Sequence, residues 1–491
     1  MAEKPDRIGT IETRGIDAVP DHERHGRASE LFWMWFGANM GVLGITLGAG
    51  LVVFNGLNAF QVLLVAVLGA GGSFAFVGAL SVAGQRGGAP GLTLSRAVFG
   101  PRGNAGPTLV SWLGFVGWET IMCTTAAFAL LALLDLAGIG SSVALTVVCV
   151  VVTVIIAAVI GLFGHATIMF LQRWLTYVFG ALTAVVVVFL IANVDFAAVT
   201  AVPAAPASQV VIGIGTIAAG TGLGWLAAGA DYARYLPRTV SPRSIISATI
   251  WGAGLPLVVL ITMGALMSTG GTDLAQANDP VAAIGSSLPS WMAVPYLLTA
   301  VAGLIAAADL SMYSSGLNLL AVGIRIPRTA AILVDALIIT VGGIYITVIA
   351  EDFYGPFITF LTLLAVPLVV WGVIFLIDMA FRRSYDPVGL ADTSTTSRYW
   401  YTGGIRWVAL GPWIAGIAVG FAFTTAAAGE VTWFAGPLAT TFIGRNGLGW
   451  LMAAITAGVC YLVARRIWPE APEVLDPVGA AAEAAAQEGI G

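Results

Sequence analysis

Long apolar segments, separated by short polar stretches, occupy almost the whole chain. Each is about 20 or more residues long, enough for an α-helix to cross a hydrocarbon core about 30 Å thick. The pattern predicts an all-α integral membrane protein with twelve transmembrane helices. The predicted segments lie near residues 31–55, 57–84, 105–134, 142–164, 168–191, 208–230, 244–268, 291–322, 327–349, 353–377, 404–427 and 446–464.

Basic residues are distributed very unevenly across this alternating pattern. Twenty of the 21 Lys and Arg residues lie on its N-terminal side, and Arg445 alone lies on the other side. Short loops rich in Lys and Arg stay in the cytoplasm, so both termini are predicted to be cytoplasmic. We therefore expect a multi-pass protein of the inner or plasma membrane.

Composition argues against several other classes of protein. The chain is 58% hydrophobic and only 10% charged, whereas soluble domains are about 25% charged. No segment is basic enough to indicate nucleic-acid binding, and the three His residues form no metal-binding or catalytic pattern. We therefore expect no enzyme, no bound metal and no cofactor. Polar residues 1–28 and 469–491 are predicted to be disordered cytoplasmic tails, and the oligomeric state is left open.

Glycine clusters interrupt two of the predicted helices, within residues 37–50 and 213–224. A glycine in a helix interior costs roughly 1 kcal/mol relative to alanine, and irregular backbone within a membrane is tolerated only against protein or water. The clusters lie five segments apart, so their segments enter the membrane from opposite sides. This indicates an inverted repeat, residues 29–191 and 208–378, with a substrate site at the broken helices and two further helices within 404–468. The alternative is that membrane helices are simply rich in glycine.

Three ionisable residues lie well inside the predicted segments: Glu119, Asp309 and Asp335. A carboxylate facing lipid costs about 2.5–3.5 kcal/mol on insertion scales, so such residues usually face the bundle interior or water. Each is a candidate for ion or substrate handling. The alternative for each is a structural hydrogen bond to a neighbouring helix.

Two tryptophans are candidates for binding a planar ligand. Trp118 and Trp225 lie in the middle of predicted segments, next to Gly117 and Gly224. An indole face beside a glycine suits a flat ring, because aromatic stacking adds about 0.5–1.5 kcal/mol beyond burial. Ordinary packing is the alternative.

Several sequence motifs together resemble one transporter family, the nucleobase:cation symporter-1 family, in its purine–cytosine permease branch. The resemblance covers about residues 30 to 468 and rests on LFWMWFGAN (31–39), GAPGLTLSRAVFG (88–100), RGN (102–104), VGWE (116–119), ADYARYLP (230–237) and YSSGL (313–317). It implies a LeuT-like fold, in which a five-plus-five inverted repeat is followed by two C-terminal helices. It also implies alternating access and import of a nucleobase or related heterocycle, of the cytosine or purine type, by cation symport.

The resemblance also implies a substrate site made by four helices. Helices 1 and 6 would contribute unwound backbone, helices 3 and 6 a stacking tryptophan each, and helix 8 polar contacts. The implied substrate-binding residues are Gly37, Ala38, Asn39, Trp118, Met122, Gly220, Thr221, Gly222, Trp225 and Asp309.

The chain departs from the family pattern at positions that would contact the edge of the substrate or the coupling cation. Met122 stands where many relatives have Asn or Gln, and Gly37 stands where many have Ser or Gln. Ala306 and Ala307 stand where sodium-coupled members have two hydroxyl residues that join helix 1 carbonyls around the ion. Alanine supplies no ligand oxygen, and a hard cation needs several.

These departures favour protons over sodium as the coupling ion. Asp309 is the first candidate for the proton carrier and Glu119 the second. The exact heterocycle stays open. The alternative function is a symporter of the same fold for another small solute, such as allantoin, a hydantoin, a vitamin or an amino acid.

Overall fold

The structure is a computed structural model of the chain, and it describes residues 7–12, 14–192, 194–269, 274, 279–324, 326–350, 354–428 and 431–481. The first part of this chain forms an interrupted first helix and four long helices. These are α1 (Ala28–Ala38), α2 (Leu43–Val53), α3 (Ala59–Ala66) continued by a π-helical turn (Val67–Gly71) and α4 (Gly72–Gly87), α5 (Gly91–Leu94), α6 (Arg96–Phe99), α7 (Ala105–Leu136), α8 (Val143–Leu162), α9 (His165–Ala192) and α10 (Phe196–Ala201). A short 3₁₀ turn at Asp21–Glu23 precedes them.

A second interrupted helix opens the next part. It consists of α11 (Ala207–Gly220), a 3₁₀ turn (Gly222–Trp225) and α12 (Ala228–Ala233). Then follow α13 (Pro242–Thr269), α14 (Pro280–Gly285), α15 (Ser290–Ala321), α16 (Arg328–Ile344) with a π-helical turn (Tyr345–Ile349), α17 (Tyr354–Phe381), α18 (Pro387–Ala391), α19 (Trp407–Phe423), β1 (Thr425–Ala428), β2 (Val431–Ala435), α20 (Phe442–Arg445), α21 (Gly449–Ile467) and α22 (Pro472–Leu475).

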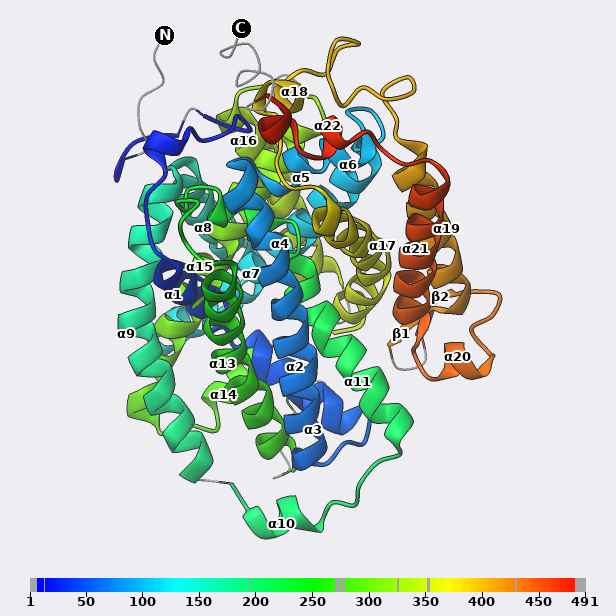
Figure 1. The fold of residues 1–491 in the computed structure, drawn as a ribbon. Helices are drawn as coiled ribbons and strands as arrows, with labels where there is room; N and C mark the ends of the chain where they lie inside the picture. The colour runs from blue at the N-terminus through cyan, green and yellow to red at the C-terminus, as the bar shows by residue number, and fades with distance from the viewer. Residues whose placement is uncertain are drawn as a thin grey trace, which may run out of the picture.

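The described helices are those of a multi-pass membrane protein. Ten are long and apolar enough to cross a membrane, and α1 and α2 together make an eleventh span bent by 61°. The shorter apolar helix α19 occupies the predicted segment 404–427. Helices α19 and α21 stand at one side of the main bundle and carry a small antiparallel hairpin, β1–β2 (Figure 1). The sequence prediction of helices alone missed this hairpin, which lies at the end of an apolar run and whose strands are only four and five residues long.

Both predicted glycine-rich breaks are present. The first lies between α1 and α2, at residues 39–42, and the second lies at Thr221, whose φ of −132° and ψ of −103° are not helical. Without a regular i→i−4 ladder at these points, backbone amides and carbonyls become free for other partners. Each break therefore interrupts its span where a solute could contact the main chain.

Close packing places the first broken helix against α13. A Cβ on Gly48 would collide with the carbonyl of Ile261, and a Cβ on Gly264 would collide with the carbonyl of Ile45. Small residues let membrane helices approach to backbone contact. Glycine at these two positions therefore fixes α2 directly on α13.

The described part of the N-terminal segment makes buried contacts with the bundle, in a region where the sequence predicts a disordered tail. At the end of the bundle where both described tails lie (Figure 1), Glu12 is 5% exposed and accepts hydrogen bonds from Arg234 (2.5 Å) and Tyr235 (2.8 Å). Burial opposes ionisation of Glu12, but the positive charges of Arg234 and Arg328 outweigh it and hold its pKa at about 2. Ionic pairing, which single-residue polarity does not reveal, orders this part of the chain.

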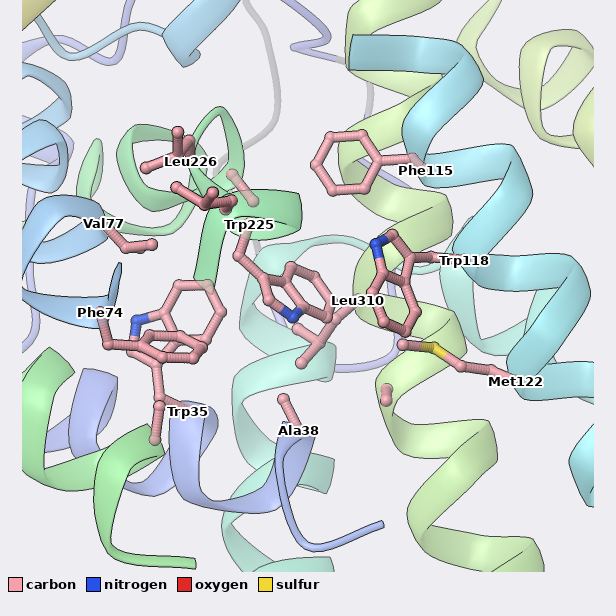
Figure 2. Packing of buried hydrophobic residues seen from close by; sticks show 14 of the residues in the cluster. Trp35, Ala38, Phe74, Val77, Phe115, Trp118, Met122, Trp225, Leu226 and Leu310 are labelled. Carbon is pink, nitrogen blue, oxygen red and sulfur yellow. The ribbon is translucent and has the colours of Figure 1, made fainter. Parts of the chain in front are cut away.

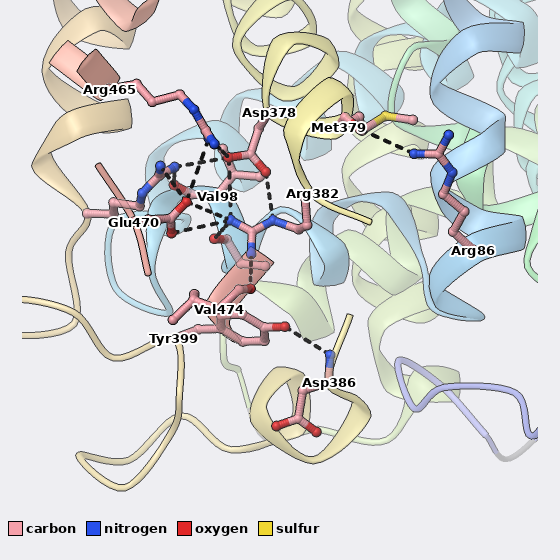
Figure 3. A network of polar contacts seen from close by, with 12 residues as sticks. Arg86, Val98, Asp378, Met379, Arg382, Asp386, Tyr399, Arg465, Glu470 and Val474 are labelled. Carbon is pink, nitrogen blue, oxygen red and sulfur yellow. Dashed lines mark hydrogen bonds and ion pairs between the residues drawn. The ribbon is translucent and has the colours of Figure 1, made fainter. Parts of the chain in front are cut away.

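A second buried ion network holds the C-terminal segment (Figure 3). Asp378 at the end of α17 pairs with Arg382 (2.7 Å) and Arg406 (3.2 Å), and Glu470 pairs with Arg406 (2.8 Å). Arg382 also donates to the carbonyl of Val474 at 2.8 Å. The network ties α17, α19 and the chain after α21 together, so residues 470–474 are part of the folded body.

Candidate functional site

A small cavity of about 50 Å³ lies where the two breaks meet α7 and α15. The broken helices supply most of its walls, and the long helices close its sides. It is lined by Ala38, Asn39, Gly41, Leu43, Gly44, Leu47, Trp118, Met122, Gly220, Thr221, Trp225, Leu257, Gly303, Leu304 and Ala307. Seven of the ten predicted substrate-binding residues are thereby brought together; Gly37, Gly222 and Asp309 lie outside the lining.

Trp118 and Trp225 reach the cavity from opposite sides, one from α7 and one from the turn after α11, with Met122 beside Trp118 (Figure 2). Trp225 makes an edge contact with Trp35, with centroids 5.5 Å apart at 77°. Trp118 makes an edge contact with Phe357, at 5.7 Å and 82°. These T-shaped contacts are a favoured aromatic geometry, and they hold both indoles in fixed orientations.

The glycines beside the tryptophans make room for protein side chains. A Cβ on Gly224 would lie 2.5 Å from Nε1 of Trp118, and a Cβ on Gly117 would collide with the ring of Phe360. The sequence had associated these glycines with space for a ligand. In the structure they instead allow the aromatic side chains to approach the backbone of neighbouring helices.

The break between α1 and α2 contributes Asn39 and Gly41 to the cavity lining. Asn39 donates from Nδ2 to the carbonyl of Trp35 at 2.9 Å, so its amide group caps the end of α1. Gly37 faces away from the cavity, because a Cβ there would lie 2.6 Å from Oε1 of Gln172 and 2.7 Å from the Thr176 hydroxyl of α9. Gly37 therefore controls how closely α1 approaches α9.

Ser73 of α4 supports the break in the second interrupted helix. Its hydroxyl accepts a hydrogen bond from the backbone N–H of Gly222 at 3.1 Å and donates to the carbonyl of Ala70 at 3.0 Å. The Thr221 hydroxyl lies 3.3 Å from it and donates to the carbonyl of Ile217 at 2.6 Å. The sequence analysis missed Ser73, whose only signal was a hydroxyl within an apolar segment.

Asp309 of α15 is completely buried next to the cavity wall. Its Oδ1 accepts a hydrogen bond from Nε2 of Gln172 at 3.1 Å, and the same Nε2 donates to the carbonyl of Ala306 at 2.6 Å. Within the described part of the chain, Oδ2 of Asp309 has no hydrogen-bond partner. Gln172 is a further residue that the sequence analysis missed, since one polar residue in the segment 168–191 gives no hint of its partner.

The other two candidate carboxyls, Glu119 and Asp335, lie near Ser315 of α15. Asp335 of α16 accepts hydrogen bonds from the Ser315 hydroxyl (2.7 Å) and the Trp112 indole (2.8 Å). Glu119 is completely buried on α7, close to Ser315 and Asp335. Asp335 thus fits the structural alternative of a helix-to-helix hydrogen bond, whereas Glu119 directly follows the cavity residue Trp118.

A permease family matches nearly the whole chain. The family described as permease for cytosine/purines, uracil, thiamine, allantoin matches residues 18–448. The chain belongs to this family. The resemblance inferred from the sequence motifs is therefore confirmed, and the protein is a membrane transporter, not an enzyme.

Curated relatives of this family show the same similarity at the sequence level. YxlA of Bacillus subtilis (strain 168), assigned to the purine–cytosine permeases, is 25% identical over 92% of this chain and 95% of its own length. The purine–cytosine permease FCY2 of Saccharomyces cerevisiae is 28% identical over 55% of this chain, which is 49% of the yeast protein. The similarity to FCY2 thus spans only about half of each protein.

Solved structures confirm the fold. Mhp1, a nucleobase-cation-symport-1 family transporter in a closed conformation with bromovinylhydantoin bound, superposes with a TM-score of 0.70 at 18% identity, covering 93% of this chain and 96% of its own. The inward-facing conformation of Mhp1 gives a TM-score of 0.69. MhsT in complex with L-phenylalanine gives 0.56. The LeuT-like fold predicted from the motifs is the fold of this protein.

Proposed function

We propose that the protein imports a nucleobase or related heterocycle, of the cytosine or purine type, by proton symport across the inner or plasma membrane. The observation that carries the proposal is the cavity that two tryptophans and two helix breaks enclose, in a chain of the cytosine/purine permease family. Both termini are proposed to face the cytoplasm, as the asymmetry of basic residues indicates.

The heterocycle is proposed to lie between Trp118 and Trp225. Base–aromatic stacking tolerates many ring systems because every base has a π-face. Thr221 and the backbone at Gly220 would contact polar atoms at the ring edge, since both line the cavity at the break. Gly222 would act through backbone geometry, because its N–H is bound by Ser73.

Substrate binding requires the cavity to widen. A cavity of about 50 Å³ is far smaller than the roughly 300–1,000 Å³ of pockets that hold drug-sized ligands. We propose that Met122 moves first, because it is unbranched, polarisable and adaptable. Where relatives carry an amide, Met122 offers no strong hydrogen bond, so specificity rests on the backbone and Thr221.

The coupling ion is proposed to be a proton. Ala306 and Ala307 give no side-chain oxygen to a cation, and a hard cation needs several oxygen ligands. Asp309 and Glu119 are both completely buried, and both have carboxyl oxygens without a hydrogen-bond partner within the described chain. Asp309 is the proposed carrier, with Glu119 second. Buried carboxyls of this kind often form proton relays in transporters.

A second candidate is a substrate that is not a nucleobase, such as thiamine, allantoin or a hydantoin. The family description includes uracil, thiamine and allantoin, and the Mhp1 structure holds a hydantoin. Purified protein in proteoliposomes would be offered radiolabelled cytosine, purines, uracil, allantoin, a hydantoin and thiamine. An inward proton gradient in sodium-free buffer should drive accumulation of a nucleobase. Accumulation that needs sodium and ignores a protonophore would refute proton coupling. Uptake of a non-nucleobase alone would favour the second class.

A further inference from the structure

Gln172 occupies a central position between three helices of the site. It is completely buried on α9, and its Nε2 group makes two hydrogen bonds to α15, at the carbonyl of Ala306 (2.6 Å) and the carboxyl of Asp309 (3.1 Å). Its Oε1 has no hydrogen-bond partner among the described residues. That oxygen faces α1, because a Cβ on Gly37 would lie 2.6 Å from it.

The family resemblance implies that a coupling cation would lie between the helix 1 carbonyls and residues 306 and 307 of α15. Ala307 lines the same cavity as Ala38 and Gly41, so one of the two alanines that stand at the hydroxyl positions faces the first helix break. The neighbouring carbonyl, that of Ala306, is already the acceptor of the Gln172 amide. An amide N–H₂ group and a cation satisfy oxygen atoms in the same way, by presenting positive charge to them.

We propose that Gln172 replaces the coupling cation as the link between α9 and α15 beside the first helix break. Its two N–H bonds join the predicted first repeat to the predicted second repeat without an inorganic ion, and its packing against Gly37 positions α1. Gln172 is thus a positioning residue, and transport needs no sodium because the amide already provides the link. The inference rests on the proposed cation symport and deepens it.

The first test removes the amide while keeping the side chain's approximate size. Gln172→Leu should lose gradient-driven accumulation by about tenfold or more, because the Asp309 carboxyl and the Ala306 carbonyl lose their donor. Substrate binding, measured by the quenching of tryptophan fluorescence, should stay within about threefold, since Gln172 does not line the cavity. Unchanged accumulation in this variant would overturn the inference, and so would equal losses of binding and accumulation, which a purely structural role predicts.

The second test rebuilds a cation site. In the triple variant Gln172→Ala, Ala306→Ser, Ala307→Thr, sodium should restore uptake and raise the melting temperature, while the wild type should respond to sodium in neither measurement. Ala308→Ser adds a hydroxyl to the same helix at a buried position that neither lines the cavity nor bonds to Gln172, so it should leave the protein insensitive to sodium. A folded triple variant that ignores sodium in both measurements would overturn the inference. If the triple variant does not fold, Gln172→Leu decides.

Failure of the proposed function is recognised separately. If the wild-type protein itself requires sodium, both the proposal of proton symport and the proposed role of Gln172 are refuted. If the wild type is driven by protons but Gln172→Leu accumulates substrate normally, only the inference about Gln172 falls.

Discussion

At the scale of single residues, the site depends on a few side chains whose orientation is set by their neighbours. Trp118 and Trp225 are each 7% exposed and held by edge contacts with other aromatic rings. Asp309 is held on one carboxyl oxygen and left without a partner on the other within the described chain. The proposed stacking and the proposed proton exchange therefore involve different residues, which separate mutations can test.

Replacing Trp118 with alanine tests stacking. We expect Trp118→Ala to weaken substrate binding by about 1–3 kcal/mol, the usual value of a base–aromatic stack, and Trp118→Phe to recover part of the loss. Isothermal titration calorimetry of the purified variants would measure the change in binding free energy. Trp174→Ala, at a side chain 55% exposed on α9, is the matched control and should bind normally. Wild-type affinity of Trp118→Ala for every accepted substrate would contradict stacking.

Replacing Asp309 with asparagine tests the proton carrier. We expect Asp309→Asn to lose concentrative uptake under an imposed proton gradient while keeping substrate exchange, because asparagine cannot exchange a proton between the two sides. Glu119→Gln is the parallel variant. Loss of concentrative uptake in Glu119→Gln alone would move the role to Glu119.

At the scale of elements, the two interrupted helices create the site. The break in the second is supported from outside by Ser73, which binds the N–H of Gly222 at 3.1 Å. A helix end without such a partner leaves buried backbone groups unpaired, which costs free energy inside a membrane. The transport geometry therefore depends on α4 as well as on the broken helix itself.

Ser73→Ala should destabilise the break. Loss of the acceptor leaves the Gly222 N–H unpaired, at a cost of about 1–3 kcal/mol, so the melting temperature and the uptake rate should both fall. Ser81→Ala on the same helix is the control, because the only hydrogen bond of the Ser81 hydroxyl within the described chain goes to the carbonyl of Val77, in its own helix. Equal melting temperatures for Ser73→Ala and the wild type would show that Ser73 does not support the break.

Gly220→Val should abolish transport without preventing membrane insertion. A Cβ at Gly220 would already lie 3.1 Å from a methyl group of Leu47 across the cavity, and valine adds two further methyl groups. Gly411→Val on α19, where a Cβ meets no atom within 4 Å, should transport normally. Uptake by inside-out and right-side-out vesicles would measure both, and normal transport by Gly220→Val would place the substrate elsewhere.

At the scale of the whole molecule, terminal segments fasten the end of the bundle where they lie. Glu12 is buried against Arg234, with side chains 2% and 0% exposed, whereas the pair of Glu30 and Arg173 is 30% and 43% exposed. Removing one partner of a buried pair leaves an uncompensated charge, while an exposed pair is screened by water. The tail thus contributes to the stability of the whole transporter.

Glu12→Ala should lower the free energy of unfolding by about 3–5 kcal/mol, because Arg234 stays buried without its carboxylate. The control Arg173→Ala should change it by less than about 1 kcal/mol. Thermal denaturation in detergent would compare them, and equal shifts would contradict the argument. The contribution of Glu12 is present above its ordinary pKa of 4.5 and is lost as the pH falls towards its folded pKa of about 2.

The orientation of the molecule is a separate prediction. Both tails should face the cytoplasm, so cysteine tags at either end should not react with an impermeant reagent in intact cells. A tag next to Arg445, the single basic residue on the other side, should react. Labelling of the tails in intact cells would contradict the predicted orientation.

The sequence by itself determined the membrane class, the succession of spans, the two breaks and the family. These features are local. The length of an apolar segment decides whether it can span a membrane, and glycine clusters mark places where interrupting a helix costs little free energy. Motifs such as ADYARYLP then identify the family without three-dimensional information.

Only the tertiary structure decided which polar groups meet. Gln172 and Asp309 lie 137 positions apart, and Ser73 and Gly222 lie 149 apart, so no spacing rule connects them. The buried pair of Glu12 and Arg234 likewise depends on a tail returning to the bundle, where burial makes an ion pair strong enough to order it. Partners of this kind are fixed by the packing of helices, because desolvation forces each buried polar group to find whichever partner the fold brings near.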